Sequence, residues 1–296
     1  MIDALIDVQG STLKTIQATL RSLLTSGAVD ALLVPVSLPS GSVAPMLVTD
    51  PDALDQANPL APVLPFNAAR AASLLTASHH PGTLGLVLRP CEIRALVELV
   101  KFQQASLDNA LIIGIDCLGA YSVSDYQNTD QDQLLDQLLA TAPTGQPQPH
   151  DDLAFRDACQ TCEHPLPTGD HLTLSFGIIG VEPGSLYLRV RDDLAQALEL
   201  AASEPPPGRA AAAKTYLGAR IQARDTAFAQ FHDRLHSIDD LLHEFSACIR
   251  CHNCMVNCPI CYCRECIFRT PTFEHESQLF FQWAERKGTV RLLPDT

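Results

Sequence analysis

The chain has 296 residues, a formal net charge of −14 at pH 7 and few aromatic residues, at 6%. An acidic chain of this kind is a poor partner for nucleic acid or for an anionic membrane surface, so we expect neither. No apolar run approaches the ~18 residues that a membrane-spanning helix needs, and residues 1–7 lack a leader-like basic or apolar pattern. We therefore expect a cytoplasmic protein with no direct membrane span.

The first part of the chain predicts one helix and one strand. Apolar residues at helical spacing predict a helix over 12–27, with Gly27 as its C-terminal cap. Residues 31–36 form a short apolar run that predicts a buried strand. The proline-rich stretch 37–65 is expected to be mostly irregular.

A βαβ unit follows. Residues 84–88 and 111–115 predict apolar strands, and residues 92–104 between them predict a helix. A strand, a helix and a strand within about 32 residues make a right-handed unit with two parallel strands. The fold class predicted for this part of the chain is therefore α/β, with a mixed, mostly parallel sheet.

Two cysteines follow the ends of these two strands. Cys91 opens the helix after the first strand, and Cys117 follows the second strand. Both belong at the carboxyl edge of a parallel sheet, where open α/β folds bind ligands, and adjacent strands would bring the two thiols to one cluster. Two buried core cysteines are the ordinary alternative.

A C-x2-C pair, Cys159 and Cys162, brings the number of cysteines in this part of the chain to four. Four thiolates are what one 4Fe–4S cluster requires, so the pair favours a shared cluster site. Beyond it, residues 172–181 and 185–190 predict strands around a turn at 182–184. A helix over 193–203 is expected to close the domain.

A proline-rich segment over 203–209 is the clearest boundary in the chain. We expect two units, 1–205 and 206–296, the second mostly helical. It should contain a long helix to about residue 235, a helix that begins at Ser237 and leads to Cys248, and a last helix over 278–286.

Seven of the eleven cysteines lie in nineteen residues of this second unit. The run begins C-x2-C-x2-C-x3-C-P, the ferredoxin-like spacing that binds 4Fe–4S clusters. Cys248, Cys251 and Cys254 with one later cysteine are the safest ligand set, and His252 is a possible substitute ligand. The complete run is Cys248, Cys251, Cys254, Cys258, Cys261, Cys263 and Cys266.

Zinc and disulfides are the alternatives for this run. Structural zinc sites use four ligands, usually as two separated pairs, whereas these pairs overlap. A disulfide framework needs an oxidising compartment, for which residues 1–7 show no leader. Iron–sulfur clusters, two or three in the whole chain, are therefore the favoured interpretation. His79 and His80 are assigned no role.

Residues 13–235 resemble the β subunits of the coenzyme F420 hydrogenase and dehydrogenase family, which includes formate dehydrogenase subunits. The C-terminal cysteine run is an addition to the basic family pattern, and Thr173 stands where the family tends to have Asp. The matching elements, in order, are Ser26-Gly-Ala-Val-Asp30, Pro90-Cys91-Glu92, Cys117, Cys159-x-x-Cys162 and Ser175-Phe-Gly177-Ile-Ile-Gly180.

The resemblance implies that the four matching cysteines bind a 4Fe–4S cluster beside FAD in the first unit. It also implies electron exchange with a deazaflavin coenzyme and a partner subunit that carries the other half-reaction. We place the flavin contacts at the carboxyl edge of the sheet, although each of these residues also has an ordinary structural use. The candidate contacts are Arg89, Glu92, Asp116, Ser175, Gly177 and Gly180.

Three functions follow. The favoured one is an electron-transfer iron–sulfur flavoprotein subunit of a multi-subunit oxidoreductase, such as a formate dehydrogenase, hydrogenase or heterodisulfide-reductase-like complex. It would pass electrons between a deazaflavin or nicotinamide carrier, or a partner, and its 4Fe–4S clusters. The alternatives are a flavin-free 4Fe–4S relay adaptor and an iron–sulfur or zinc sensor or scaffold.

Overall fold

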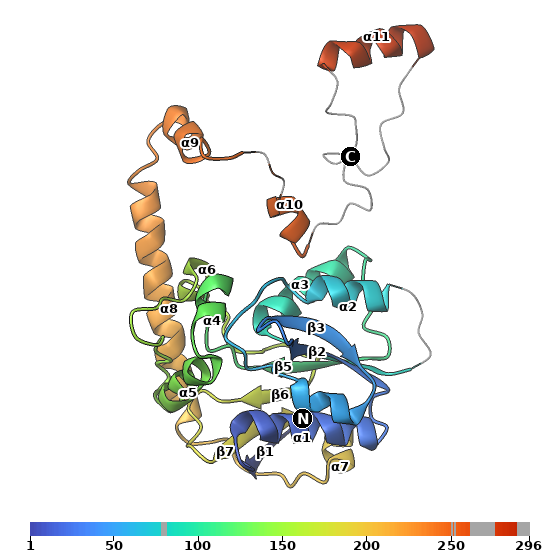
Figure 1. Ribbon diagram of the computed structural model, residues 1–296, viewed down its shortest axis with the longest axis vertical. Helices are drawn as coiled ribbons and strands as arrows, with labels where there is room; N and C mark the ends of the chain where they lie inside the picture. Colours follow the sequence, from blue (N-terminus) through green and yellow to red (C-terminus); the bar gives the residue numbers. More distant parts are fainter. Residues whose placement is uncertain (78–81, 250, 252, 261–275, 289–296) are drawn as a thin grey trace.

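The computed structural model describes residues 1–77, 82–249, 251, 253–260 and 276–288 (Figure 1). Its centre is a seven-stranded sheet in the order β1-β7-β6-β5-β4-β2-β3. β2, β4, β5 and β6 are consecutive parallel neighbours, and β3, β7 and β1 complete the sheet through antiparallel pairs. The strands are β1 (Ile2–Asp7), β2 (Ala31–Ser37), β3 (Val43–Val48), β4 (Leu84–Leu88), β5 (Ala110–Ile115), β6 (Leu172–Gly177) and β7 (Ser185–Val190).

Helices cover both faces of the sheet because its central strands are apolar on both faces. Ile113 lies in the core that contains α1 (Thr12–Thr25), while Ile112, its neighbour on β5, lies in the core of the opposite face. That second core is formed with α2 (Ala69–Thr76) and α3 (Pro90–Lys101). Figure 1 shows α1 on one side of the sheet and α2 and α3 on the other.

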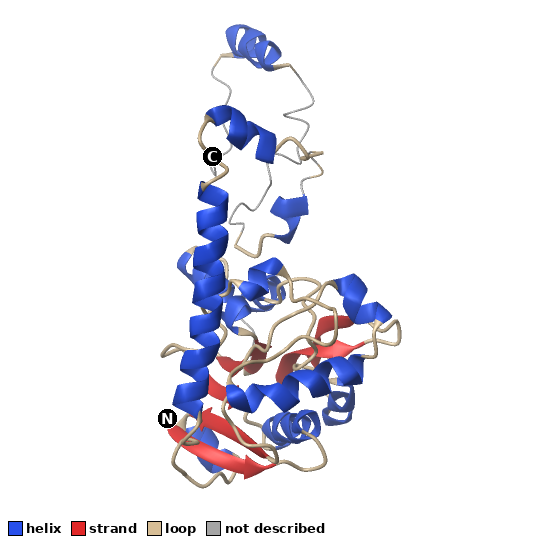
Figure 2. Ribbon diagram, turned by 90° about the vertical axis from the view of Figure 1, so that its left-hand side faces the viewer, coloured by secondary structure: helices blue, strands red, loops and turns tan. Residues whose placement is uncertain are grey.

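Shorter helices surround the sheet, and a long helix leaves it. α8 (Arg209–His232) buries Ala212 and Tyr216 in its first half, and its second half extends away from the sheet (Figure 2). The remaining helices are η1 (Pro51–Gln56), α4 (Val123–Asn128), α5 (Gln131–Thr141), η2 (Ala142–Thr144), α6 (Asp157–Gln160), α7 (Asp192–Ala197), α9 (Ile238–Glu244), α10 (Asn253–Asn257) and α11 (Ser277–Lys287).

The predicted α/β class is confirmed, and so is the βαβ unit of β4, α3 and β5, whose strands are parallel neighbours. Three details were wrong. Residues 37–65 are not mostly irregular, because they contain β3 and η1; the strand predicted over 172–181 ends at Gly177; and the helix predicted over 193–203 is the shorter α7. The predicted division at residue 205 falls shortly before α8 and stays a prediction.

Within the described ranges, the structure contains no helix that is long and apolar enough to cross a membrane.

Candidate metal centre at the carboxyl edge of the sheet

Cys91 and Cys117 lie at one edge of the sheet. β4 and β5 pair in parallel through Leu88 and Gly114, so the two strands end side by side. Cys91 lies in the first turn of α3, directly after β4, and Cys117 follows β5 by two residues. The two strands are therefore adjacent, as the prediction of a shared site for Cys91 and Cys117 required.

The structure brings Cys159 to the same place. Burial raises the pKa of the Cys91 thiol far above its usual value, and the nearby Cys117 and Cys159 oppose its ionisation further. Burial also raises the pKa of Cys159, again with a contribution from Cys117. Three thiols from three separate segments therefore lie close enough to affect one another's charge. The raised pKa values of Cys91 and Cys159 are unlike those of reactive cysteines, whose pKa values are lowered.

Cys162 lies beyond the end of α6, and its backbone N–H donates to the Cys159 carbonyl at 3.4 Å. Among the described residues, no three His, Cys, Asp or Glu side chains come together as ligands of a single metal ion. A 4Fe–4S cluster has a different requirement, because each of its four thiolates binds a separate iron atom. All four cysteines are free of disulfides and partly exposed.

Two side chains of α8 hold the backbone of this centre. Tyr216 Oη donates to the Cys117 carbonyl oxygen at 2.8 Å, and Arg220 donates to the Cys159 carbonyl oxygen. Both side chains are buried. These contacts were not predictable from the amino-acid sequence, because an arginine in an alanine-rich helix is usually a solvated residue.

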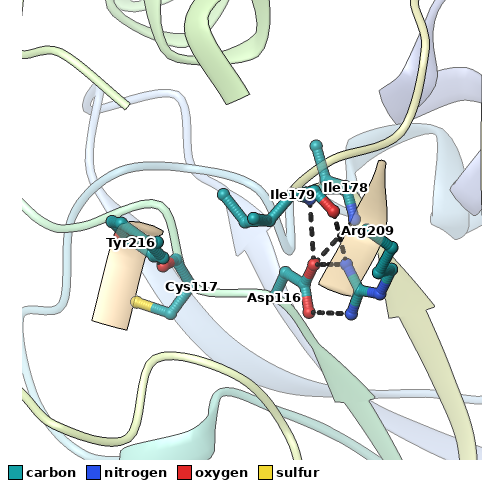
Figure 3. A network of polar contacts seen from close by, with 6 residues as sticks. All are labelled: Asp116, Cys117, Ile178, Ile179, Arg209 and Tyr216. Atoms are coloured by element: carbon teal, nitrogen blue, oxygen red, sulfur yellow. Dashed lines mark hydrogen bonds and ion pairs between the residues drawn. The ribbon is translucent and has the colours of Figure 1, made fainter. Parts of the chain in front are cut away.

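Asp116 anchors the start of α8 to the same edge (Figure 3). Its carboxylate accepts two hydrogen bonds from Arg209 Nη1 and Nη2, at 2.6 and 3.0 Å. It also accepts the backbone N–H groups of Ile178 and Ile179, at 2.8 and 3.0 Å. Figure 3 shows the Cys117 sulfur pointing away from this network. Asp116 thus has four donors within the protein, and its predicted flavin contact stays a prediction.

Arg89 and Glu92 lie at the start of α3 and are almost fully buried. The Glu92 carboxylate accepts the backbone N–H groups of Arg89 and Ala68, both at 2.9 Å, which stabilises the first turn of the helix. Burial raises the pKa of Glu92. Arg89 donates through Nη2 to the Ala61 carbonyl, but its buried Nη1 has no hydrogen-bond partner among the described residues. That free donor is available to a bound group.

The other predicted flavin contacts lie on β6 or just after it. Ser175 pairs with Gly114 on the neighbouring strand and is buried. A Cβ atom on Gly177 would come within 2.4 Å of the Tyr187 ring, and one on Gly180 within 2.7 Å of α8. Gly180 also has a φ of +69°, which glycine adopts readily. Both glycines thus permit close packing inside the protein.

A cavity of about 350 Å³ lies beside Cys91. It is bounded by α3, through Arg94 and Val97, and by the segment that precedes β6, through His164 and His171. The buried His171 Nε2 has no hydrogen-bond partner among the described residues. The cavity combines an apolar wall, a few polar groups and one candidate metal ligand, as small-molecule sites do.

The C-terminal cysteine run is described only in part. Cys248, Cys251 and Cys254 are exposed, and Cys258 is half-buried. Ile260, two residues after Cys258, lines the cavity beside Cys91. The segment that follows Cys258 therefore reaches the cavity beside Cys91. Cys261, Cys263, Cys266, His252, His79 and His80 lie outside the described residues.

The fold is similar to that of a solved structure. The structure superposes on a chain of the F420-reducing [NiFe] hydrogenase complex from Methanosarcina barkeri, with a TM-score of 0.52 and 12% sequence identity. The match covers 81% of this chain and 94% of that chain. This likeness shows that the two chains share a fold. None of the family models searched matches the chain.

The amino-acid sequence is similar to those of two formate dehydrogenase β subunits. The chain is 23% identical over 217 residues to the F420-dependent formate dehydrogenase 1 subunit beta of Methanococcus maripaludis. It is 22% identical over 220 residues to the corresponding subunit of Methanocaldococcus jannaschii. These matches cover 62% and 64% of this chain, but only 55% and 58% of the relatives. The resemblance to F420-dependent β subunits is confirmed, and the chain matches little more than half the length of those relatives.

Proposed function

We propose that this chain is an electron-transfer iron–sulfur flavoprotein subunit of a multi-subunit oxidoreductase. The observation that carries the proposal is the convergence of Cys91, Cys117 and Cys159 from three separate segments at the carboxyl edge of the sheet. Cys162, three residues after Cys159, supplies the fourth thiol that a 4Fe–4S cluster requires. The similarity to formate dehydrogenase β subunits supports the same function.

The C-terminal run would hold one or two further clusters. Three exposed cysteines, Cys248, Cys251 and Cys254, have the spacing of the ferredoxin-like motif and are accessible to a partner. Ile260 brings this segment to the cavity beside Cys91. In this proposal the chain's own residues hold two redox centres on either side of one cavity, and the exposed run faces the partner subunit.

The cavity beside Cys91 is the proposed site of the flavin ring. Its volume of about 350 Å³ lies within the range of roughly 300–1,000 Å³ that is typical of small-molecule sites. His171 lines this cavity, and its buried Nε2 has no partner among the described residues, so it suits a polar ring atom. When bound, a flavin exchanges hydride with a carrier and single electrons with a cluster.

The carrier that exchanges hydride with the flavin would be a deazaflavin coenzyme or a nicotinamide. The deazaflavin is favoured because the curated relatives are F420-dependent. The other half-reaction would belong to a partner subunit of a formate dehydrogenase, hydrogenase or heterodisulfide-reductase-like complex. In this proposal the chain's residues bind and orient the carriers, and the partner supplies the second substrate.

A flavin-free relay adaptor is the second candidate, and one observation favours it. Four of the six predicted flavin contacts are engaged in packing or hydrogen bonds within the protein, namely Glu92, Asp116, Gly177 and Gly180. The two candidates predict different results when the anaerobically purified chain is mixed with reduced deazaflavin coenzyme or with NADH. The flavoprotein bleaches a flavin absorbance band and then reduces its clusters, whereas a relay adaptor does neither with either carrier.

A substitution in the cavity tests where the flavin ring binds. Val97 is half-buried on α3 and lines the cavity. Val97→Phe should therefore lower the affinity for FAD at least about tenfold, or ~1.4 kcal/mol, without loss of iron. The matched control is Val100→Phe, because Val100 is half-buried on the same helix but does not line the cavity. Equal FAD affinity in the two variants would place the flavin elsewhere.

A further inference from the structure

Tyr216 and Arg220 of α8 form a buried pair against two of the candidate cluster ligands. They are four residues apart and therefore lie on one face of the helix. Tyr216 Oη donates to the Cys117 carbonyl at 2.8 Å, and Arg220 donates to the Cys159 carbonyl and to Tyr216 Oη. The Arg220 guanidinium carbon lies 4.2 Å from the centre of the Tyr216 ring. One helix turn thus joins two cysteine-bearing segments.

The charge of Arg220 has no anionic partner in the described part of the chain. Arg220 is only 5% exposed, and none of the ion pairs formed by the described residues includes it. Its hydrogen bonds go to a carbonyl and a phenol, both neutral acceptors. A buried guanidinium without a counter-charge is costly. An anion bound beside Cys117 and Cys159 would remove that cost.

We propose that Arg220, oriented by Tyr216, is the buried counter-charge of the iron–sulfur cluster held by Cys91, Cys117, Cys159 and Cys162, and that it raises the reduction potential of this cluster. The inference rests on the proposed function, because it requires a cluster at these cysteines. It makes Arg220 a positioning and potential-setting residue that contacts the ligand backbone.

The sign of the effect follows from charge. A cluster held by four thiolates is anionic, and reduction by one electron adds one more negative charge. A nearby fixed positive charge stabilises the reduced form more than the oxidised form, so its removal should lower the potential. Water that enters the site would raise the reduction potential, because polar solvent stabilises the more highly charged, reduced form.

Loss of the Arg220 charge and entry of water would shift the potential in opposite directions, so the variant must remove the charge without admitting water. Tyr216 and Arg220 also line a second cavity of about 450 Å³, with Phe155 and Gln160. A short side chain at position 220 would let water from that cavity approach the cysteines. Arg220→Met removes the charge but keeps most of the side-chain length, so it isolates the electrostatic effect.

The experiment is a redox titration followed by EPR on the full-length chain, purified anaerobically. The signal of this cluster is the one that Cys117→Ala removes. In Arg220→Met, the equilibrium constant for reduction should fall at least tenfold, which is a shift of about 59 mV toward negative potential for a one-electron couple. Arg220→Lys, which keeps the charge, should show less than half of that shift. If Arg220→Met does not retain its cluster, Arg220→Gln replaces it, with the same expectation.

Arg224→Met is the matched control. Arg224 lies one turn further along α8, and its charge is already paired with Glu163 and Asp225. It should leave the potential unchanged. An unchanged or higher potential in an iron-loaded Arg220→Met variant would overturn this inference alone. A wild-type chain that purifies without iron would overturn the proposed function as well.

Discussion

Cys117→Ala should remove about four iron atoms per chain, the content of one 4Fe–4S cluster. Cys117 contributes to the raised pKa values of both Cys91 and Cys159. Its loss leaves three ligands in the first unit, and none of the described C-terminal cysteines is in this group. The measurement is iron and acid-labile sulfide per chain after anaerobic purification.

Cys248→Ala provides the reciprocal comparison. Cys248 is exposed and opens the C-terminal run, so its loss should lower iron in that run and preserve the cluster of the first unit. The EPR signals lost in the two variants should therefore differ. Full iron content in Cys117→Ala, or the same signal lost in both variants, would refute the division of the cysteines into two groups.

Arg209→Met should lower the free energy of unfolding by about 3 kcal/mol, at the low end of the range for breaking a buried ion pair. The Asp116 side chain is fully buried, and Arg209 supplies two of its four hydrogen bonds. Without Arg209, a buried carboxylate keeps only the two backbone donors of Ile178 and Ile179. The shift in the midpoint of urea unfolding measures the loss.

Arg191→Met is the control for that variant. Arg191 also donates two hydrogen bonds to a carboxylate, that of Asp193, but both side chains are exposed. An exposed pair of this kind contributes about 0–1 kcal/mol, so this variant should unfold close to wild type. Equal stability of the two variants would mean that Asp116 does not depend on Arg209.

Arg209 also links stability to the candidate cluster. It begins α8, and the same helix carries Tyr216 and Arg220 two to three turns later. Asp116 and Cys117 are consecutive residues, so the helix is attached to one loop through a side chain of the first and the backbone of the second. Arg209→Met should therefore weaken iron retention in the first unit as well as the fold.

Local patterns predicted the part of the fold that lies around the site. The apolar runs of β4 and β5 with α3 between them were sufficient, because a βαβ unit is defined by residues close in sequence. β1 was not predicted, since its partner β7 lies about 180 residues away. β3 was hidden by Pro45, which is tolerated because β3 is an edge strand and pairs with β2 only.

The cysteines of the candidate site were predictable from local patterns, but the residues around them were not. Strand ends placed Cys91 and Cys117, and the cysteine count added Cys159. The residues that hold them were not predictable, because burial of Arg220 and the pairing of Asp116 with Arg209 arise only when α8 packs on the sheet edge. A buried arginine and a solvated one have the same appearance in a sequence.

The most direct test of the central claim is iron, sulfide and flavin quantification on one anaerobically purified sample of the chain. We predict about one FAD and roughly 8 to 12 iron atoms per chain, as two or three 4Fe–4S clusters require. That iron content without flavin would contradict the flavoprotein and leave a relay adaptor. Stoichiometric zinc with little iron would contradict the electron-transfer function altogether.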